Sequence, residues 1–269
     1  EVSSQYQMGI LTEEEYLRQK ELLWSNASRE VAERIVQNMA EHNILYPFGP
    51  SFDDPERDDL AVRQLELMRE AGMPRTLIFG GSAMDMGWYS SDATPESDPE
   101  GFSTAIERLH ERIERQMKLW DLHVGHRNVF FSGVDEAGPG GVRRQFPFFA
   151  EIKRLGARIF VTSGDFKDAG FAVDANDHPA SIEPAAAAQW HSTGGRLFSY
   201  AAPFTGPENP DLWRRTKGMR LYMADYDGLA EYILYEGHNI WNEFVWGSGY
   251  KNFNIVYPTR DGLVDTVAW

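Results

Sequence analysis

Apolar, strand-like runs alternate with amphipathic helical patterns from residue 43 onward, and this alternation constrains the fold more than any other feature of the sequence. The strand-like runs are 43–48, 76–80, 128–134, 157–162, 180–183, 196–202 and 231–235, with 252–257 as an additional candidate. The helical patterns cover 12–25, 28–41, 55–71, 103–120, 141–155, 184–192 and 209–226. A strand–helix–strand order at a spacing of about 30 residues is typical of a parallel sheet. About seven strands of this kind favour an α/β fold of the (β/α)8 TIM-barrel type over an open doubly wound sheet.

The length of 269 residues suits one such barrel, and no linker-like segment divides the chain. We therefore expect a single barrel domain over residues 1–269, in which 1–27 form an N-terminal extension or an extra helix. The first strand and the last helix of the barrel are not evident, so the predicted barrel is incomplete at both edges. An open seam exposes unpaired backbone donors, and we expect a second chain or a further segment to cover it.

The net charge indicates which kinds of molecule the protein is expected to bind. Asp and Glu number 41 against 26 Lys and Arg, which gives a formal net charge of −15. Nucleic acids and anionic membrane surfaces both select a basic face, so we expect neither as a partner. The chain has no cysteine, which excludes disulfides and thiolate chemistry and leaves the compartment open.

Two adjacent carboxylates, Asp135 and Glu136, directly follow the apolar run Val129–Val134. Charges beside a low-dielectric wall lose hydration, so acids at the end of a buried strand are costly unless they are used. Neighbouring side chains on a strand point to opposite faces, so both acids serve one site only if the backbone breaks there. Gly138-Pro139-Gly140 stops the strand and allows that break. In the alternative interpretation, Asp135 caps the next helix and Glu136 is solvated.

Other acids and aromatics follow further predicted strands, where a barrel carries its functional site. The candidates for substrate binding are Asp85, Trp88, Glu183, Tyr200, Trp241 and Asn242. Acids and aromatics with few basic groups are typical of a sugar site rather than a phosphate site. Four of them also have a structural alternative: Asp85 as a turn residue, Glu183 as a helix cap, Tyr200 as a half-buried strand aromatic, and Trp241 as core.

Metal and cofactor motifs are missing from the sequence. The histidines form neither H-x-H nor H-E-x-x-H, and Gly80-Gly81-Ser82 does not extend to G-x-G-x-x-G. We therefore expect no metal and no cofactor.

Several motifs, in this order, resemble the barrel of glycoside hydrolase family 123 and its relatives. They are Gly133-Val-Asp135-Glu136, Leu197-Phe-Ser-Tyr200, Arg214-Arg215 with Gly228, Asn239-Ile-Trp241-Asn242, and Tyr257-Pro-Thr-Arg-Asp261-Gly-Leu-Val-Asp265-Thr266. The resemblance covers residues 28–269, without the N-terminal β-sandwich of that family. It implies a retaining β-N-acetylhexosaminidase of the N-acetylgalactosaminidase type that acts on an oligosaccharide or glycoconjugate. Glu136 would then be the general acid/base, and Asp135 would orient the 2-acetamido group. Tyr200 would hydrogen-bond the acetamido oxygen, and Trp241 would form a wall of the sugar subsite.

Three functions stay open from the sequence. The first is substrate-assisted glycoside hydrolysis, for which adjacent acids are suitable because they cannot straddle a sugar. The second is a conventional retaining glycosidase, with Glu183 or Glu243 as a nucleophile about 5 Å from Glu136. The third is a barrel that binds glycans without catalysis.

Overall fold

A computed structural model describes residues 28–44, 52–74, 78–91, 93–162, 166–178, 182–200, 211, 214–230, 256–258 and 263–265. Six parallel strands form one sheet in which each strand pairs with the next one along the chain. The strands are β1 (Ile78–Ser82), β2 (Val129–Ser132), β3 (Arg158–Thr162), β4 (Ala175–His178), β5 (Arg196–Ser199) and β6 (Gly228–Leu229). A doubly wound sheet reverses its strand order at a switch point, whereas this sheet does not. The sequential order is that of a β/α barrel, as the sequence predicts.

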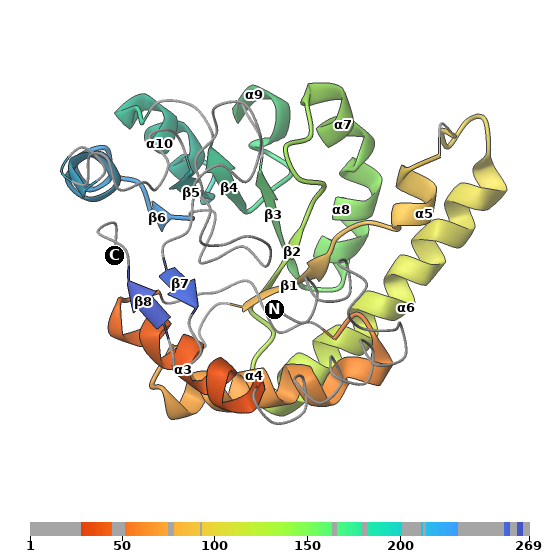
Figure 1. Cartoon of the computed structure of the whole chain (residues 1–269). Coiled ribbons are helices and arrows are strands. Elements are labelled where there is room, and N and C mark those ends of the chain that lie inside the picture. The colour runs from red at the N-terminus through yellow and green to blue at the C-terminus, as the bar shows by residue number, and fades with distance from the viewer. Residues whose placement is uncertain are drawn as a thin grey trace, which may run out of the picture.

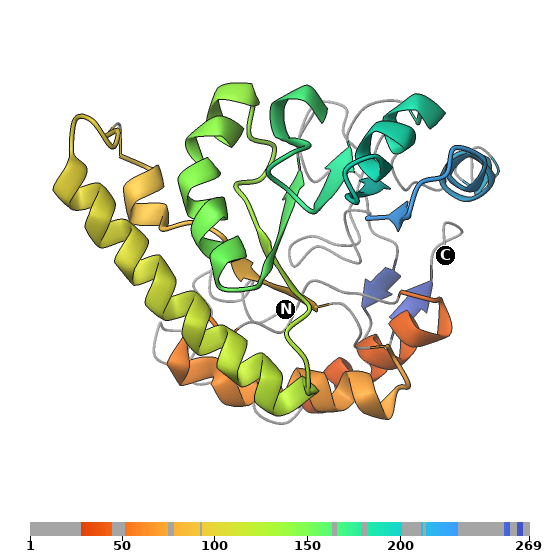
Figure 2. The same cartoon turned by 180° about the vertical axis from the view of Figure 1, so that it is seen from behind.

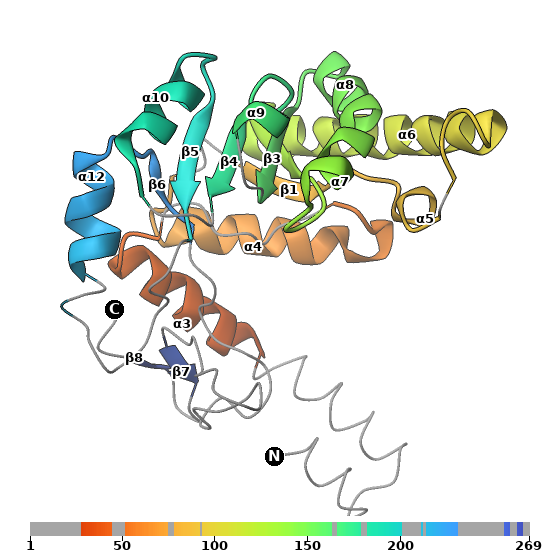
Figure 3. The ribbon, with the colours of Figure 1, turned by 90° about the horizontal axis from the view of Figure 1, so that it is seen from above.

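Helices connect the strands and lie outside the arc that the strands form (Figures 1 and 2). They are α3 (Ser28–Glu41), α4 (Asp58–Glu70), α5 (Met86–Tyr89), α6 (Pro99–Val124), α7 (Pro139–Arg144), α8 (Phe146–Arg154), α9 (Phe166–Ala169), α10 (Pro184–His191) and α12 (Leu221–Met223). A 3-10 turn, η2 (Pro55–Arg57), precedes α4, and a π-helix, η3 (Arg215–Arg220), leads into α12. Figure 3 shows the strands following one another toward β6, with α12 beyond it. No helix in the described part of the chain is both long and apolar enough to span a membrane.

A short antiparallel pair, β7 (Val256–Pro258) and β8 (Leu263–Asp265), lies beside α3 (Figure 1). The late part of the chain therefore returns next to the early helices. Among the described strands, β1 and β6 are the edges of the large sheet. The expected cover for a barrel seam stays a prediction.

Side chains of alternate strand residues enter two separate cores. The larger core joins the outward face of the sheet to the helices and contains Phe131, Ile159 and Leu197, each fully buried. A second cluster, on the opposite face, consists of strand residues alone: Phe130, Phe160 and Ala175, with Phe198 packed against them. The period-two alternation of a strand explains this division. The second cluster marks the inner face of the barrel.

The longest helix, α6, follows the amphipathic pattern that the sequence shows. Ala105, Leu109, Ile113, Gln116, Met117 and Trp120 are buried. The helix begins at Pro99 rather than at Ser103, because Asp98 accepts the N–H of Gly101 at 2.9 Å and proline is suited to the first turn. Gly125, with φ of 82°, ends it in the left-handed conformation.

Helices α6 and α8 are joined by a charged cluster. Nδ1 of His110 lies 2.5 Å from Oε1 of Glu151, and Arg154 donates two hydrogen bonds to the same carboxylate. The hydrogen bonds from Arg154 lower the pKa of Glu151 most, burial opposes them, and His110 adds to the lowering. The ionised carboxylate is therefore stabilised in the folded protein.

Several predicted boundaries are wrong. The strand predicted to 134 ends at Ser132, and 165–179, predicted as irregular, contains α9 and β4, whereas 182–183 are not strand. Ala175-Asn-Asp-His has little strand propensity, but it pairs with β3 and β5 on both sides, and tertiary pairing overrides the weak preference. The loop predicted over 81–101 contains α5 and the start of α6. The last parallel strand in the described part is Gly228–Leu229. The predicted helix 12–25 and strand 231–235, with most of strand 43–48, lie outside the described residues.

Candidate functional site

The backbone leaves the sheet directly before the two adjacent acids. Gly133 is the last residue to bond the neighbouring strand, since its N–H donates to the carbonyl of Phe160 at 2.8 Å. Asp135 and Glu136 then lie in a turn, both exposed, and Glu136 has φ of 47°. A non-glycine residue in this left-handed region stores strain, which is common at functional sites. The backbone break that the two acids require is present.

Tyr200 reaches the same turn from another strand. Its hydroxyl donates to Oε1 of Glu136 at 2.9 Å. Tyr200 follows Phe198 by two residues and so lies on the inner side of the barrel. Because β3 and β4 lie between β2 and β5, this hydrogen bond passes over the carboxyl ends of two strands. The structure thus brings together two of the predicted site residues, Glu136 and Tyr200, which lie 64 positions apart in sequence, and Asp135 precedes Glu136 in the same turn.

Below this polar pair the inner face is aromatic. Phe160 and Phe198 pack with ring centroids 6.4 Å apart and an interplanar angle of 64°. Phe130 joins them in the same cluster. Phe130 and Phe160 are almost fully buried, so this cluster packs the interior of the barrel on its inner face.

Asp85 has a structural role in the described structure. It is the N-cap of α5, accepting the N–H of Trp88 at 2.9 Å, and it accepts a 2.8 Å hydrogen bond from Arg108. Burial alone would raise the pKa of the Asp85 carboxyl, but the bonds from Arg108 and the Trp88 backbone outweigh it and hold the pKa below its ordinary value. The interpretation of Asp85 as a turn residue therefore agrees with the structure better than a role in substrate binding.

Trp88 is part of the core, with 8% of its surface exposed. Its ring packs edge-to-face on Phe102 at 5.6 Å and on Phe148 at 6.4 Å. The guanidinium of Arg144 lies 5.5 Å from the ring centroid. These contacts cover most of the indole. The geometry therefore favours a core role for Trp88 over the predicted role of stacking against a sugar.

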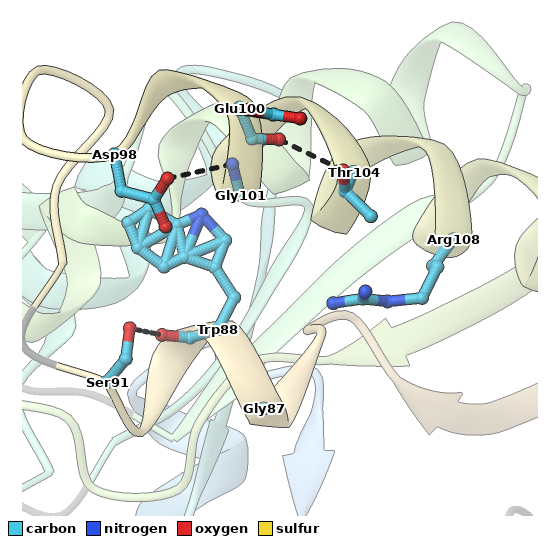
Figure 4. A pocket seen from close by; sticks show the side chains of 8 residues that line it. All are labelled: Gly87, Trp88, Ser91, Asp98, Glu100, Gly101, Thr104 and Arg108. Atoms are coloured by element: carbon cyan, nitrogen blue, oxygen red, sulfur yellow. Dashed lines mark hydrogen bonds between the residues drawn. The ribbon is translucent and has the colours of Figure 1, made fainter.

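A groove of about 430 Å³ lies between α5 and the first turns of α6 (Figure 4). Its lining consists of Gly87, Trp88, Ser91, Asp98, Glu100, Gly101, Thr104 and Arg108. The hydrogen bonds in this group close helix turns: Ser91 to the Trp88 carbonyl, Gly101 N–H to Asp98, and Thr104 to the Glu100 carbonyl. Arg108 is engaged by Asp85. The groove is therefore built from groups that already stabilise the two helices.

Glu183 lies at the start of α10 and faces a different neighbour from Glu136. Its carboxylate is 3.9 Å from Arg220, and its backbone N–H donates to the hydroxyl of Tyr226 at 3.3 Å. Burial raises the pKa of Tyr226, and the bond from Glu183 N–H opposes that effect. Glu183 occupies the N-cap position of α10, as the alternative interpretation expects. Its side chain makes no capping hydrogen bond.

Trp241, Asn242 and Glu243 lie outside the described residues. Within the described part, no group of three or more acids and histidines is arranged to hold a metal. Sequence reasoning missed Gln145, a fully buried residue whose side chain contacts the turn of the two acids. It missed the inner phenylalanine cluster too, which the alternation along strands 128–134 and 196–202 could have revealed.

The fold and site define an α/β barrel with a carboxylate–tyrosine pair at the carboxyl ends of its strands. No model of a known protein family matches the sequence, and no curated protein is significantly similar to it. Among solved structures, D-psicose 3-epimerase from Clostridium cellulolyticum H10, determined with D-tagatose, is similar with a TM-score of 0.45 and 14% identity, covering 81% of this chain and 83% of that chain. D-allulose 3-epimerase from Methylomonas sp. has a TM-score of 0.41 and 14% identity, covering 76% and 78%. The sequential strand order of the sheet itself defines the fold class.

Proposed function

We propose that this protein is a retaining glycoside hydrolase that acts on a 2-acetamido sugar by substrate-assisted catalysis. The observation that carries the proposal is the hydrogen bond between Tyr200 and Glu136, exposed at the carboxyl ends of β5 and β2. Active sites of β/α barrels lie at this end. The negative net charge agrees with a neutral sugar rather than an acidic one as the ligand. The motif order, which resembles that of glycoside hydrolase family 123, is a further reason for the proposal.

Glu136 is the general acid/base in this mechanism. Because Tyr200 donates to Oε1, the proton of the protonated carboxyl resides on Oε2, which is then the oxygen that faces the leaving group. Oε2 gives this proton to the glycosidic oxygen as the bond to the anomeric carbon breaks. In the second half-reaction the carboxylate takes a proton from the attacking water.

Asp135 is the partner of the substrate's own nucleophile. The carbonyl oxygen of the 2-acetamido group attacks the anomeric carbon and forms an oxazolinium ion as the leaving group departs. An ionised Asp135 accepts the N–H of the acetamido group and stabilises the positive charge that develops there. Water then attacks the anomeric carbon and opens the oxazolinium ring. The product keeps the anomeric configuration of the substrate. Residues adjacent in one turn suit this division of roles, whereas a conventional pair must lie on opposite sides of the scissile bond.

The test uses aryl 2-acetamido glycosides with good and poor leaving groups. Glu136→Gln is expected to lower kcat by about 10²–10⁴-fold on poor leaving groups and far less on good ones, because protonation matters only for the former. Tyr200→Phe removes one hydrogen bond to the carboxyl group of Glu136 and is expected to lower kcat by about 10- to 10²-fold, since hydrogen bonds to charged groups contribute about 1.5–3 kcal/mol. Glu107→Gln, at an exposed position on α6, is the matched control and should match the wild type.

Three outcomes contradict this mechanism. A covalent glycosyl-enzyme trapped on Glu183 or Glu243 indicates the conventional two-carboxylate mechanism. Glycan binding with no turnover of any aryl glycoside at pH values of about 5–7 indicates a non-catalytic barrel. Equal losses in Glu136→Gln and Glu107→Gln remove Glu136 from the catalytic role.

A further inference from the structure

Gln145 lies at the junction of α7 and α8, and its side chain contacts both the backbone of α7 and Val134, directly before the two acids. The residue is fully buried and makes no side-chain cap bond to α8. Oε1 accepts the N–H of Val134 at 2.8 Å, and Nε2 donates to the carbonyl of Gly141 at 3.1 Å. One amide group therefore links Val134, directly before the turn of the two acids, to Gly141 in the first turn of α7.

The amide of Gln145 packs closely against the backbone of Gly133. A Cβ placed on Gly133 would lie 2.9 Å from Oε1 of Gln145, 3.0 Å from Val161 and 3.2 Å from Phe149. Exchanging the amide oxygen and nitrogen would set a donor against the Val134 N–H and an acceptor against the Gly141 carbonyl. The orientation of the amide is thus determined by its partners.

We infer that Gln145 is the positioning residue that holds Glu136 in reach of Tyr200. Glu136 keeps a left-handed backbone conformation, and such a conformation persists only when its surroundings enforce it. The bonds to Val134 and Gly141 restrain the chain on both sides of Glu136. Glutamine suits the position because one planar group supplies an acceptor and a donor at once. The inference rests on the proposed function for its catalytic consequence, whereas the geometric consequence is independent of it.

The kinetic test compares two buried glutamines. Gln145→Met keeps the length and removes both hydrogen bonds, and it is expected to lower kcat by about 10²-fold with KM little changed, as a misplacement near 1 Å does. Gln116→Met, at an equally buried position on α6 where the amide binds Asp53, is the matched control and should keep the wild-type kcat. Gln145→Glu is expected to restore most of kcat, because a buried carboxyl is protonated and then both accepts and donates.

The second test does not depend on activity. Carbon-13 NMR of tyrosines labelled at Cζ reports the hydrogen bond of each phenol, with Tyr200→Phe to assign the signal and Glu136→Ala to show its position without the bond. Gln145→Met is expected to move the Tyr200 signal toward the Glu136→Ala position, and Gln116→Met is expected to leave it unchanged.

The combined outcomes separate this inference from the proposed function. A displaced Tyr200 signal in Gln145→Met, in a protein without glycosidase activity, supports the positioning role and contradicts the proposed function. An unmoved signal and unchanged kcat in Gln145→Met overturn the positioning role alone. Equal effects of Gln145→Met and Gln116→Met overturn it too, because they show a general loss of packing.

Discussion

Replacing Trp88 decides between a core residue and a sugar-binding surface. The indole is 8% exposed, and truncating a buried tryptophan to alanine costs about 3–5 kcal/mol in the free energy of unfolding. Two edge-to-face ring contacts, to Phe102 and Phe148, add to the burial, each contributing about 0.5–1.5 kcal/mol. The indole Nε1 has no hydrogen-bond partner among the described residues, so no polar contact is lost with it. We therefore expect Trp88→Ala to lie in the upper half of the 3–5 kcal/mol range.

Urea unfolding followed by far-UV circular dichroism measures this loss. Tyr222→Ala is the control, because Tyr222 is 86% exposed and exposed substitutions usually stay within about 0.5 kcal/mol. Trp88→Phe keeps a ring in the same place, and it should lose less stability and leave KM for an aryl glycoside unchanged. A loss below about 1 kcal/mol for Trp88→Ala, together with a large rise in KM, would refute the core assignment.

Two further changes test the described packing. Gly81→Ala should cost about 1–3 kcal/mol in unfolding free energy, because its Cβ would displace the carboxylate of Asp53 from the hydrogen bonds that Gln116 and Arg112 donate to it. Gly140→Ala has open space around its Cβ and should cost nothing, and similar unfolding midpoints for the two variants would contradict the close approach. The folded pKa of Glu151 is depressed below its ordinary 4.5, so its contribution is complete above that pH and is lost as pH falls through the folded value. Urea titrations from neutral to acidic pH should give a weaker loss of stability below pH 4.5 for Glu151→Gln than for the wild type, and equal pH dependence would contradict the stabilised carboxylate.

The sequence predicts the sheet and the turn of the acids because both depend on local periodicity. The run from Val129 alternates between two buried faces, and the acids after it mark where burial stops. Tyr200 is predictable by the same argument, since it ends the strand whose inner residue is Phe198. That Tyr200 binds Glu136 is not predictable from either segment, because the contact depends on how far the sheet curls between β2 and β5.

Other features depend on tertiary pairing and could not be predicted. Strand β4 has weak propensity and forms because β3 and β5 flank it. Glu183 follows a strand, as a catalytic acid would, yet its exposed carboxylate lies 3.9 Å from Arg220 of η3. Trp88 lies in a long polar segment of the sequence. No local pattern there predicts that Phe102 and Phe148 pack against it.

The most direct test of the central claim measures turnover of two aryl glycosides that differ only at C2, one with a 2-acetamido group and one with a 2-hydroxyl. Proton NMR of the first-formed sugar follows its anomeric configuration, and Asp135→Asn is assayed beside the wild type. The account predicts turnover of the acetamido substrate alone, with retained configuration and a large loss in Asp135→Asn because the charge that stabilises the oxazolinium ion is gone. Comparable turnover of the hydroxyl substrate, or an inverted product, would contradict it.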